Sequence, residues 1–307
     1  MSLDPQIAPL IEALDAGFPP VHTMTGAQAR ATIRSRFVPP AKLEPVAEVR
    51  DESISGPGGD IAVRIYRPDG DSLPILVYAH GGGFVFCDLE SHDGLCRAIA
   101  NQVPAVVISV DYRLAPENQW PDAAEDVYTV ARWAADNADA VGGDAQRVVV
   151  GGDSAGGNLA AVTALMSRDR GDPPIAGQLL IYPVIAADFN NESYRLFGNG
   201  FYNPKPALQW YWDQYVPARA DREHPYASPL RANLAGLPPA VIVTAGHDPL
   251  RDEGNAYADA LDAAGVITVR CPFDGGIHGF MTMPMLDIAH QARRQACLEL
   301  AQLLRNG

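Results

Sequence analysis

Residues 152–156 form the sequence Gly-Asp-Ser-Ala-Gly and directly follow an apolar run at 148–150. A serine with a glycine two positions away on each side fits a sharp turn from strand to helix, because small residues let the neighbouring backbone pass closely. Such a turn exposes the hydroxyl of Ser154, and the N-terminus of the following helix favours negative charge beside it. We therefore predict that Ser154 is a nucleophile for attack on a carbonyl carbon. The alternative is a phosphate-binding glycine turn, but the segment matches neither of the two common phosphate-binding motifs.

A second glycine-rich segment, His80-Gly81-Gly82-Gly83-Phe84, follows another apolar run at 75–79. Consecutive glycines leave backbone N–H groups unobstructed, and an acyl-transfer enzyme needs such donors to bind the oxyanion of its tetrahedral intermediate. We predict that Gly82, Gly83 and Ala155 form this oxyanion hole. Taken alone, the segment could equally be a flexible turn. His80 is expected to order the loop by hydrogen bonding.

Seven histidines compete for the role of general base: His22, His80, His92, His224, His247, His278 and His290. This serine motif occurs with the chain order serine, acid, histidine, so the histidines before Ser154 are excluded as the base. His290 falls in a helical pattern and His224 in an irregular segment, so both are expected to be surface or packing residues. His278 follows the last apolar strand pattern in a glycine-containing loop, and we predict that it is the base.

The predicted acid is Asp248, which follows the apolar run at 240–243. A buried carboxylate at this place can fix the tautomer of the imidazole and stabilise its protonated form. Asp252 and Glu253 are the nearest rivals. Both begin a helical pattern, where acidic residues commonly interact only with the helix dipole.

The pattern of elements predicts an α/β fold. Continuous apolar runs are typical of parallel strands buried on both faces, and helical patterns separate them. Alternating residues at 61–66, after a turn-rich segment at 55–59, predict an antiparallel hairpin at the sheet edge. A last strand is expected from Val266 to Cys271, before a C-terminal helix. The parallel strands are expected at residues 75–78, 105–110, 148–150, 179–181 and 240–243.

Two segments interrupt this alternation. Residues 4–37 contain two short helical patterns, and residues from about 188 to 237 are rich in aromatic, Pro and Asn residues. Open α/β sheets bind ligands at the carboxyl ends of their strands, and we expect both segments to pack there as a helical cap. The predicted organisation is an N-terminal cap segment at 1–45 and a catalytic domain at 46–307, with a cap insertion at about 188–237.

The composition limits which class of partner and which cellular location we expect. The formal charge of −14, from 23 basic and 37 acidic residues, disfavours binding to nucleic acid or to an anionic membrane. A small molecule is the expected partner. The N-terminus lacks the features of a signal peptide, and no segment has the length of apolar residues that a bilayer requires. The four cysteines have neither CxxC pairing nor metal-ligand spacing, so we expect reduced thiols, no metal and a cytoplasmic location.

These residues resemble the hormone-sensitive lipase family, the branch of small bacterial esterases within the α/β-hydrolases. The likeness runs from about Pro45 to the C-terminus and rests on four motifs. They are His80-Gly81-Gly82-Gly83, Tyr112-Arg113-Leu114-Ala115-Pro116-Glu117, Gly152-Asp153-Ser154-Ala155-Gly156-Gly157, and Asp248-Pro249-Leu250-Arg251-Asp252-Glu253-Gly254 with His278-Gly279-Phe280 after it.

The resemblance implies an α/β-hydrolase fold with a mostly parallel eight-stranded sheet, flanking helices and a helical cap. It also implies no metal or organic cofactor, and hydrolysis of short- to medium-chain acyl esters. By the same analogy, residues 112–117 are structural, and a homodimer is expected through the edge strand near Val266 to Cys271.

Two alternatives stay open. An amidase, lactonase or deacetylase could use the same three residues, because the preference for a leaving group depends on the shape of the pocket. A ligand-binding receptor could use the same scaffold with the histidine of the triad replaced, although His278 is present here. Large apolar residues near a cleft are as often core as pocket. We predict that the pocket is lined by Phe84, Trp210, Leu250, Phe280 and Met281.

Overall fold

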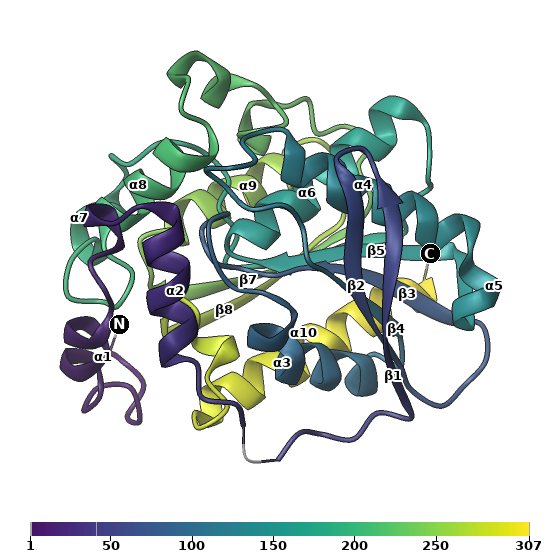
Figure 1. The fold of residues 1–307 in the computed structure, drawn as a ribbon, viewed down its shortest axis with the longest axis horizontal. Coiled ribbons are helices and arrows are strands. Elements are labelled where there is room, and N and C mark those ends of the chain that lie inside the picture. Colours follow the sequence, from purple (N-terminus) through teal and green to yellow (C-terminus); the bar gives the residue numbers. More distant parts are fainter. Residues whose placement is uncertain (1, 41, 307) are drawn as a thin grey trace.

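The computed structural model describes residues 2–40 and 42–306 and contains one eight-stranded sheet (Figure 1). The strand order is β1-β2-β4-β3-β5-β6-β7-β8. β1 pairs with β2 and β2 with β4 in antiparallel fashion, and every later pairing is parallel. The predicted mostly parallel sheet with an antiparallel hairpin is confirmed. The strands are β1 Glu48–Gly56, β2 Gly59–Arg67, β3 Leu73–Ala79, β4 Val106–Val110, β5 Gly143–Asp153, β6 Gly177–Ile181, β7 Ala240–His247 and β8 Thr268–Ile277.

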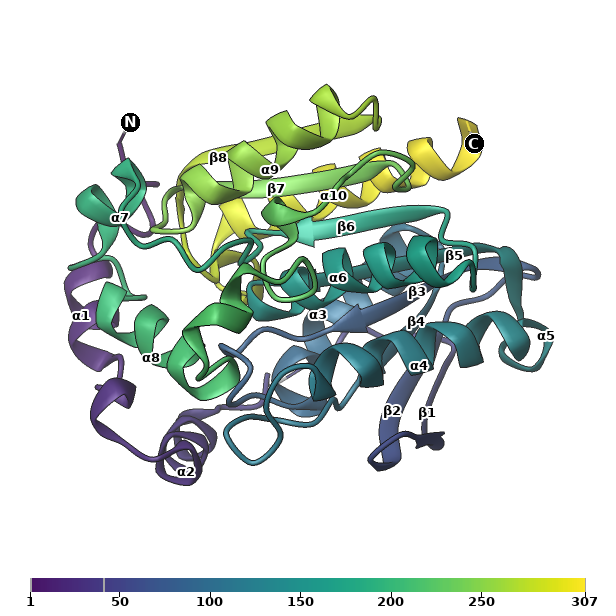
Figure 2. The same cartoon turned by 90° about the horizontal axis from the view of Figure 1, so that it is seen from above.

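Helices cover both faces of the sheet, which explains why its strands are apolar without alternation. Along β3, Ile75 and Val77 face one core, whereas Leu76 and Tyr78 face the other. Figure 2 shows α4, α6 and α9 on one face, with α3 and α10 on the other. These five helices are α3 Leu89–Gln102, α4 Asp122–Asp136, α6 Ala155–Arg170, α9 Arg251–Ala263 and α10 Asp287–Asn306, and a short helix α5 spans Ala138–Val141.

The bounds of the last strand differ from the prediction. Val266 belongs to the turn that ends α9, because its N–H donates to the carbonyl of Leu261 (3.0 Å). β8 then pairs with β7 well past Cys271, with a register shift near its end. The glycines at 275 and 276 predict a loop from their types alone. Ladder bonds from the neighbouring strand override that local tendency.

The N-terminal segment and the aromatic-rich insertion lie together at one end of the sheet (Figure 2). Two contacts join them: the N–H of Tyr202 donates to Asp15 Oδ1 (3.0 Å), and the rings of Phe18 and Tyr202 pack edge to face at 5.3 Å. This arrangement agrees with a shared cap, and the exact domain boundaries stay a prediction. The helices concerned are α1 Ile11–Gly17, α2 Gly26–Arg36, α7 Glu192–Phe197 and α8 Lys205–Tyr215.

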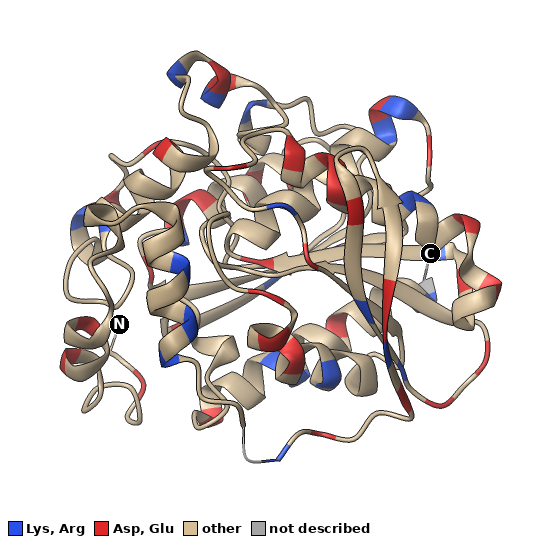
Figure 3. Ribbon diagram, in the orientation of Figure 1, with Lys and Arg blue, Asp and Glu red and all other residues tan. Residues whose placement is uncertain are grey.

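Charged residues occur mainly on the outer helices, the loops and the β1–β2 hairpin (Figure 3). Strands β3, β4, β6 and β7 contain no Lys, Arg, Asp or Glu. Within residues 2–40 and 42–306, none of the helices has the length and apolar character needed to cross a membrane. The four cysteines carry free thiols.

Candidate active site

Ser154 occupies the turn between β5 and α6 in a conformation that L-residues rarely adopt, with φ 56° and ψ −118°. Neighbouring backbone maintains it. The N–H of Ser154 donates to the carbonyl of Ile181 (2.9 Å), and the N–H of Val184 donates to the carbonyl of Ser154 (3.0 Å). Because a strained residue persists only where its surroundings over-determine it, these bonds explain how the turn is held.

The two glycines that flank Ser154 in the motif are required by close packing. A Cβ at position 156 would lie 1.9 Å from the carbonyl oxygen of Ala79, and one at position 152 would lie 2.4 Å from the same oxygen. The turn after β5 is thereby packed directly on the end of β3. This contact brings the serine turn beside the glycine-rich loop that follows β3.

The structure brings Ser154, Asp248 and His278 together, although they follow three different strands. His278 Nε2 lies 2.9 Å from Ser154 Oγ, and His278 Nδ1 lies 2.8 Å from Asp248 Oδ2. With the Nδ1 proton facing the carboxylate, Nε2 can accept the hydroxyl proton of Ser154. Asp248 is fully buried, and its second oxygen accepts the N–H of Leu250 (2.8 Å). The residues predicted as nucleophile, base and acid are thus connected by hydrogen bonds in the predicted order.

The two rival carboxylates bind other partners. Asp252 accepts the N–H of Ser193 (2.7 Å), at the start of the cap helix α7. Glu253 is buried and accepts the N–H of Ile185 (2.7 Å). Burial raises the pKa of Glu253 well above its usual value, although the backbone N–H groups at 185 and 186 oppose this. Asp252 therefore anchors the insertion to the catalytic domain, and Glu253 holds the backbone just before it.

The competing histidines are also used elsewhere. The ring of His247 packs against Phe197 and Phe201 from the cap insertion. His290 Nε2 lies 2.9 Å from the carbonyl oxygen of Pro284, and His224 Nδ1 accepts the N–H of Tyr226 (3.0 Å). These contacts agree with packing and surface roles.

Gly82 and Gly83 adopt φ values of 120° and 59°, which favour glycine. The carbonyl of Gly82 accepts two N–H groups, from Val85 and Phe86, and this closes the loop tightly. Within the described chain, none of the backbone hydrogen bonds of turns and loops uses the N–H of Gly82 or Gly83 as donor. Ala155 is the first residue of α6, so its N–H has no acceptor within the helix. The three predicted donors are thus available to a ligand.

His80 lies beneath this loop. Its Nδ1 is 2.7 Å from the carbonyl oxygen of Gly81, and its ring stacks on Tyr112 at 4.3 Å. Burial, with a further contribution from His92, lowers the pKa of His80 to about 4. His80 is therefore neutral at pH 7, and its contacts agree with the predicted role of ordering the loop.

The Tyr112 to Glu117 motif braces the same region. The hydroxyl of Tyr112 donates to the carbonyl of His80 (2.8 Å). The guanidinium of Arg113 binds the buried carboxylate of Asp126, with an Nη2–Oδ1 distance of 2.9 Å. These bonds support the structural role that the family resemblance implied for the motif.

Asp153 occupies a variable position of the serine motif, and the sequence predicts no role for it. In the structure, three groups bind its carboxylate. Its carboxylate accepts the hydroxyl of Tyr78 (2.8 Å) and the N–H of Gly81 (3.0 Å), and lies 3.2 Å from His92 Nε2. The available signal was an acidic residue beside the serine, at the end of a buried strand.

The five predicted pocket residues are all buried. Phe280 and Met281 belong to the core that also contains α10, and Phe84 stacks on Tyr215 at 3.9 Å between ring centres. Sequence reasoning missed Tyr211, whose ring lies against the backbone of Gly83: a Cβ on that glycine would be 2.5 Å from it. A cap side chain therefore lies directly over the predicted oxyanion loop, and the pocket assignment itself stays a prediction.

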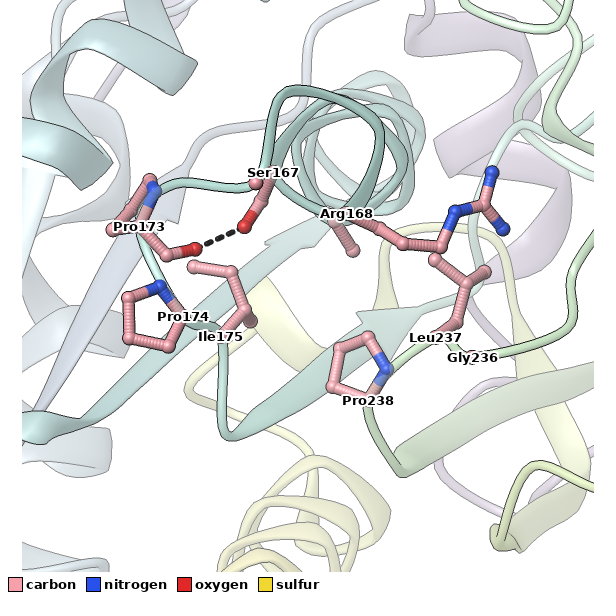
Figure 4. Close-up of a pocket in the computed structure, with 10 residues that line it drawn as sticks. Ser167, Arg168, Pro173, Pro174, Ile175, Gly236, Leu237 and Pro238 are labelled. Carbon is pink, nitrogen blue, oxygen red and sulfur yellow. Dashed lines mark hydrogen bonds between the residues drawn. The ribbon is translucent and has the colours of Figure 1, made fainter.

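An open hollow of about 290 Å³ lies away from these residues, at the amino ends of β6 and β7 (Figure 4). Its lining comes from the last turns of α6, the loop before β6 and the loop before β7. Ser167 donates a hydrogen bond to the carbonyl of Pro173 across part of it. None of its lining residues is a predicted site residue, and it lies at the end of the sheet opposite Ser154.

Known proteins resemble the chain along most of its length. The model of a family described as the α/β-hydrolase fold matches residues 76–282. Carboxylesterase NlhH of Mycobacterium tuberculosis is 39% identical over 291 residues, covering 92% of this chain and 91% of that protein. Ethyl acetate hydrolase of Pseudomonas putida is 36% identical over 298 residues, covering 92% and 93%.

Solved structures agree with these relatives. The hyperthermophilic esterase of the archaeon Pyrobaculum calidifontis superposes with a TM-score of 0.90 at 41% identity, covering 99% of both chains. Similarity at this level extends through the cap as well as the sheet. The chain belongs to the α/β-hydrolase fold family, in the hormone-sensitive-lipase-like branch that its motifs resemble.

Proposed function

We propose that the protein is a serine carboxylesterase that hydrolyses short- to medium-chain acyl esters without a cofactor. The observation that carries this proposal is the hydrogen-bonded chain from Ser154 through His278 to Asp248, beside unobstructed N–H groups. The names of the relatives, which include a carboxylesterase and an ethyl acetate hydrolase, support the same chemistry.

In the first step, Ser154 Oγ attacks the carbonyl carbon of the ester while His278 Nε2 takes the hydroxyl proton. The resulting oxyanion accepts hydrogen bonds from the N–H groups of Gly82, Gly83 and Ala155. Asp248 stabilises the imidazolium that forms. The tetrahedral intermediate collapses when His278 returns the proton to the alkoxide leaving group, and an acyl-enzyme remains on Ser154.

In the second step, water replaces the alcohol. His278 removes a proton from the water, whose oxygen attacks the acyl carbon, and the same three N–H groups bind the second oxyanion. Ser154 leaves with the proton from His278, and the carboxylic acid is released. Each histidine protonation is matched by one deprotonation, so the free enzyme is regenerated.

The test is hydrolysis of p-nitrophenyl acetate, butyrate, octanoate and palmitate by the wild type and by Ser154→Ala. We expect turnover of the shorter esters, its loss in the folded variant, and inactivation of the wild type by a serine-directed phosphonate. Full activity in Ser154→Ala would contradict the proposed mechanism. A folded wild type inert on all four esters would favour an amidase, a lactonase, a deacetylase or a receptor.

We also propose a homodimer formed through β8. This strand lies at the sheet edge, and an exposed strand edge can pair with a second chain. Ile267, immediately before β8, is 70% exposed and lies beside this edge. Sedimentation should give a dimer for the wild type and a monomer for Ile267→Asp. A wild type that stays monomeric at high concentration overturns this proposal.

We further propose that the protein acts in the cytoplasm. Its four cysteines have free thiols, and such thiols persist in a reducing compartment. Fractionation of the source cells with an antibody to the protein tests this, and recovery outside the cytoplasm contradicts it.

A further inference from the structure

The nucleophile and the oxyanion donors lie on separate loops. Ser154 follows β5, whereas Gly82 and Gly83 follow β3. The two strands are neighbours, but their pairing ends at Ala79 and Gly152. Beyond these residues, β5 leads into α6 and β3 leads into the glycine loop. The strand pairing therefore does not fix the separation of the two loops.

A side chain continues the connection where the ladder ends. Asp153 is the last residue of β5, and its Oδ1 accepts the N–H of Gly81, the residue directly before Gly82 (3.0 Å). The loops also fit closely there, because a Cβ on Gly81 would lie 2.4 Å from Asp153 Oδ2. One carboxylate thus joins the neighbour of the nucleophile to the neighbour of an oxyanion donor.

Two further groups hold that carboxylate in place. Tyr78 from β3 donates its hydroxyl to Oδ1 (2.8 Å), and His92 from α3 places Nε2 at 3.2 Å from the same oxygen and at 3.3 Å from the backbone nitrogen of Gly81. His92 is itself oriented by Ser91, whose Oγ lies 2.9 Å from its Nδ1. Burial alone would raise the pKa of Asp153, but the charge and hydrogen bond of His92 and the bond from Tyr78 lower it. The acceptor is therefore an ionised carboxylate, which forms stronger hydrogen bonds than a neutral group.

We propose that Asp153, held by Tyr78 and His92, is a positioning residue that sets the distance between Ser154 and the oxyanion donors Gly82 and Gly83. This inference rests on the proposed esterase function. Asp153 touches no substrate and acts through the N–H of Gly81. Misplacing a catalytic group by about 1 Å can cost on the order of 100-fold in rate, so a positioning defect is measurable.

The chain supplies a matched control. Tyr66 in β2 is buried like Tyr78, and its hydroxyl donates to the buried carboxylate of Asp93 at the same distance of 2.8 Å. Asp93 lies on α3, and its carboxylate binds Arg97 and Arg64. Tyr78→Phe and Tyr66→Phe therefore delete the same kind of bond, and only the first deletion touches Asp153.

The experiment measures kcat and KM on p-nitrophenyl butyrate, and binding of an aryl trifluoromethyl ketone by calorimetry. The ketone forms an adduct with the serine whose oxyanion occupies the hole, so its affinity reports donor position without turnover. We expect Tyr78→Phe to lower kcat roughly 3- to 10-fold and Asp153→Ala roughly 10- to 100-fold, with KM changed less than about 2-fold. Ketone affinity should fall in proportion to kcat/KM.

Asp153→Asn should keep most of the kcat that Asp153→Ala loses, because the amide Oδ1 can still accept the N–H of Gly81. Tyr66→Phe should lower the melting temperature about as much as Tyr78→Phe, yet leave kcat and ketone affinity near wild type.

Equal kcat in the two tyrosine variants overturns the proposal, whether both are active or both impaired. If Asp153→Ala does not fold, the tyrosine pair decides. A wild type without ester turnover refutes the proposed function instead, and the ketone measurements still test the positioning.

Discussion

The carboxyl edge of the sheet and the cap above it are held by different interactions. At the edge, Ser154, Asp248 and His278 are fixed by backbone hydrogen bonds and buried charged groups. The cap is joined to it by aromatic rings, such as the stacked pair Phe84 and Tyr215, together with a smaller set of hydrogen bonds such as that from Ser193 to Asp252. Hydrogen bonds depend steeply on geometry, whereas apolar packing tolerates substitutions that conserve volume. The comparison indicates that the chemistry is set by the edge and that substrate choice can change in the cap.

Arg30 of the cap helix α2 makes polar contacts with the catalytic domain. Its guanidinium donates to the carbonyls of Val85 (3.0 Å) and Ala115 (2.9 Å) and also pairs with Glu117. One polar side chain thus connects the cap to the loop that contains Gly82 and Gly83. The orientation of the cap and the geometry of this glycine loop are therefore not independent.

The largest effect is expected at the edge, from Asp248→Asn. The amide cannot hold His278 in the required tautomer, and the same change in a known triad lowers kcat about 10⁴-fold with little change in structure. Steady-state kinetics and a melting curve check this. Asp252→Asn is the control, because Asp252 binds Ser193 and is expected to change kcat less than about 3-fold. Comparable losses in the two variants would contradict the assignment of Asp248.

A smaller effect is expected where edge and cap meet, from Gly83→Ala. Gly83 has φ 59°, and a Cβ there would lie 2.5 Å from the ring of Tyr211. The left-handed conformation costs an alanine about 1–2 kcal/mol, and the collision displaces either the oxyanion donor or the cap. We expect a loss of roughly 10- to 100-fold in kcat/KM.

Gly171→Ala is the control for this change. Gly171 has φ 77° but no atom within 4 Å of a Cβ, so the variant has a similar conformational cost without a collision. It should lose stability and keep its activity. If both variants keep full activity, Gly83 is not part of the oxyanion hole.

The cap alone should alter selectivity more than rate. Tyr211→Ala removes the ring over Gly83 and opens space above the nucleophile. Extra space for apolar chain is worth about 1–3 kcal/mol in discrimination, so the ratio of kcat/KM for octanoate to acetate should rise roughly 10-fold. Phe189→Ala, which removes a ring packed on Tyr194 elsewhere in the cap, should leave this ratio unchanged. An unchanged ratio in Tyr211→Ala would place the acyl chain elsewhere.

The sequence predicted most of what depends on local pattern and chain order. Apolar runs identified the parallel strands, and the spacing of Ser154, Asp248 and His278 along the chain identified the residues that the structure brings together. β8 was predicted too short because its second half contains Pro272 and two glycines, and only pairing with β7 makes it a strand. Tyr211 and Asp153 were missed for a related reason: their partners lie far away in sequence, and no local spacing reports such contacts.

The smallest effect is expected at Glu253, whose carboxylate accepts the N–H of Ile185 just before the cap insertion. Burial raises its pKa well above the usual value of 4.5, so folded protein keeps this carboxyl protonated at pH values where the unfolded chain has released the proton. At Glu253 the folded state then binds more protons, so the contribution of this carboxyl to the free energy of unfolding declines as pH rises above about 4.5, by at most about 1.4 kcal/mol per pH unit. Glu253→Gln removes the titration while its Oε1 can still accept the N–H of Ile185. Urea unfolding from pH 5 to 8 should therefore show that the variant gains stability relative to wild type as pH rises. Parallel curves for the two proteins would mean that Glu253 is ionised in the folded state.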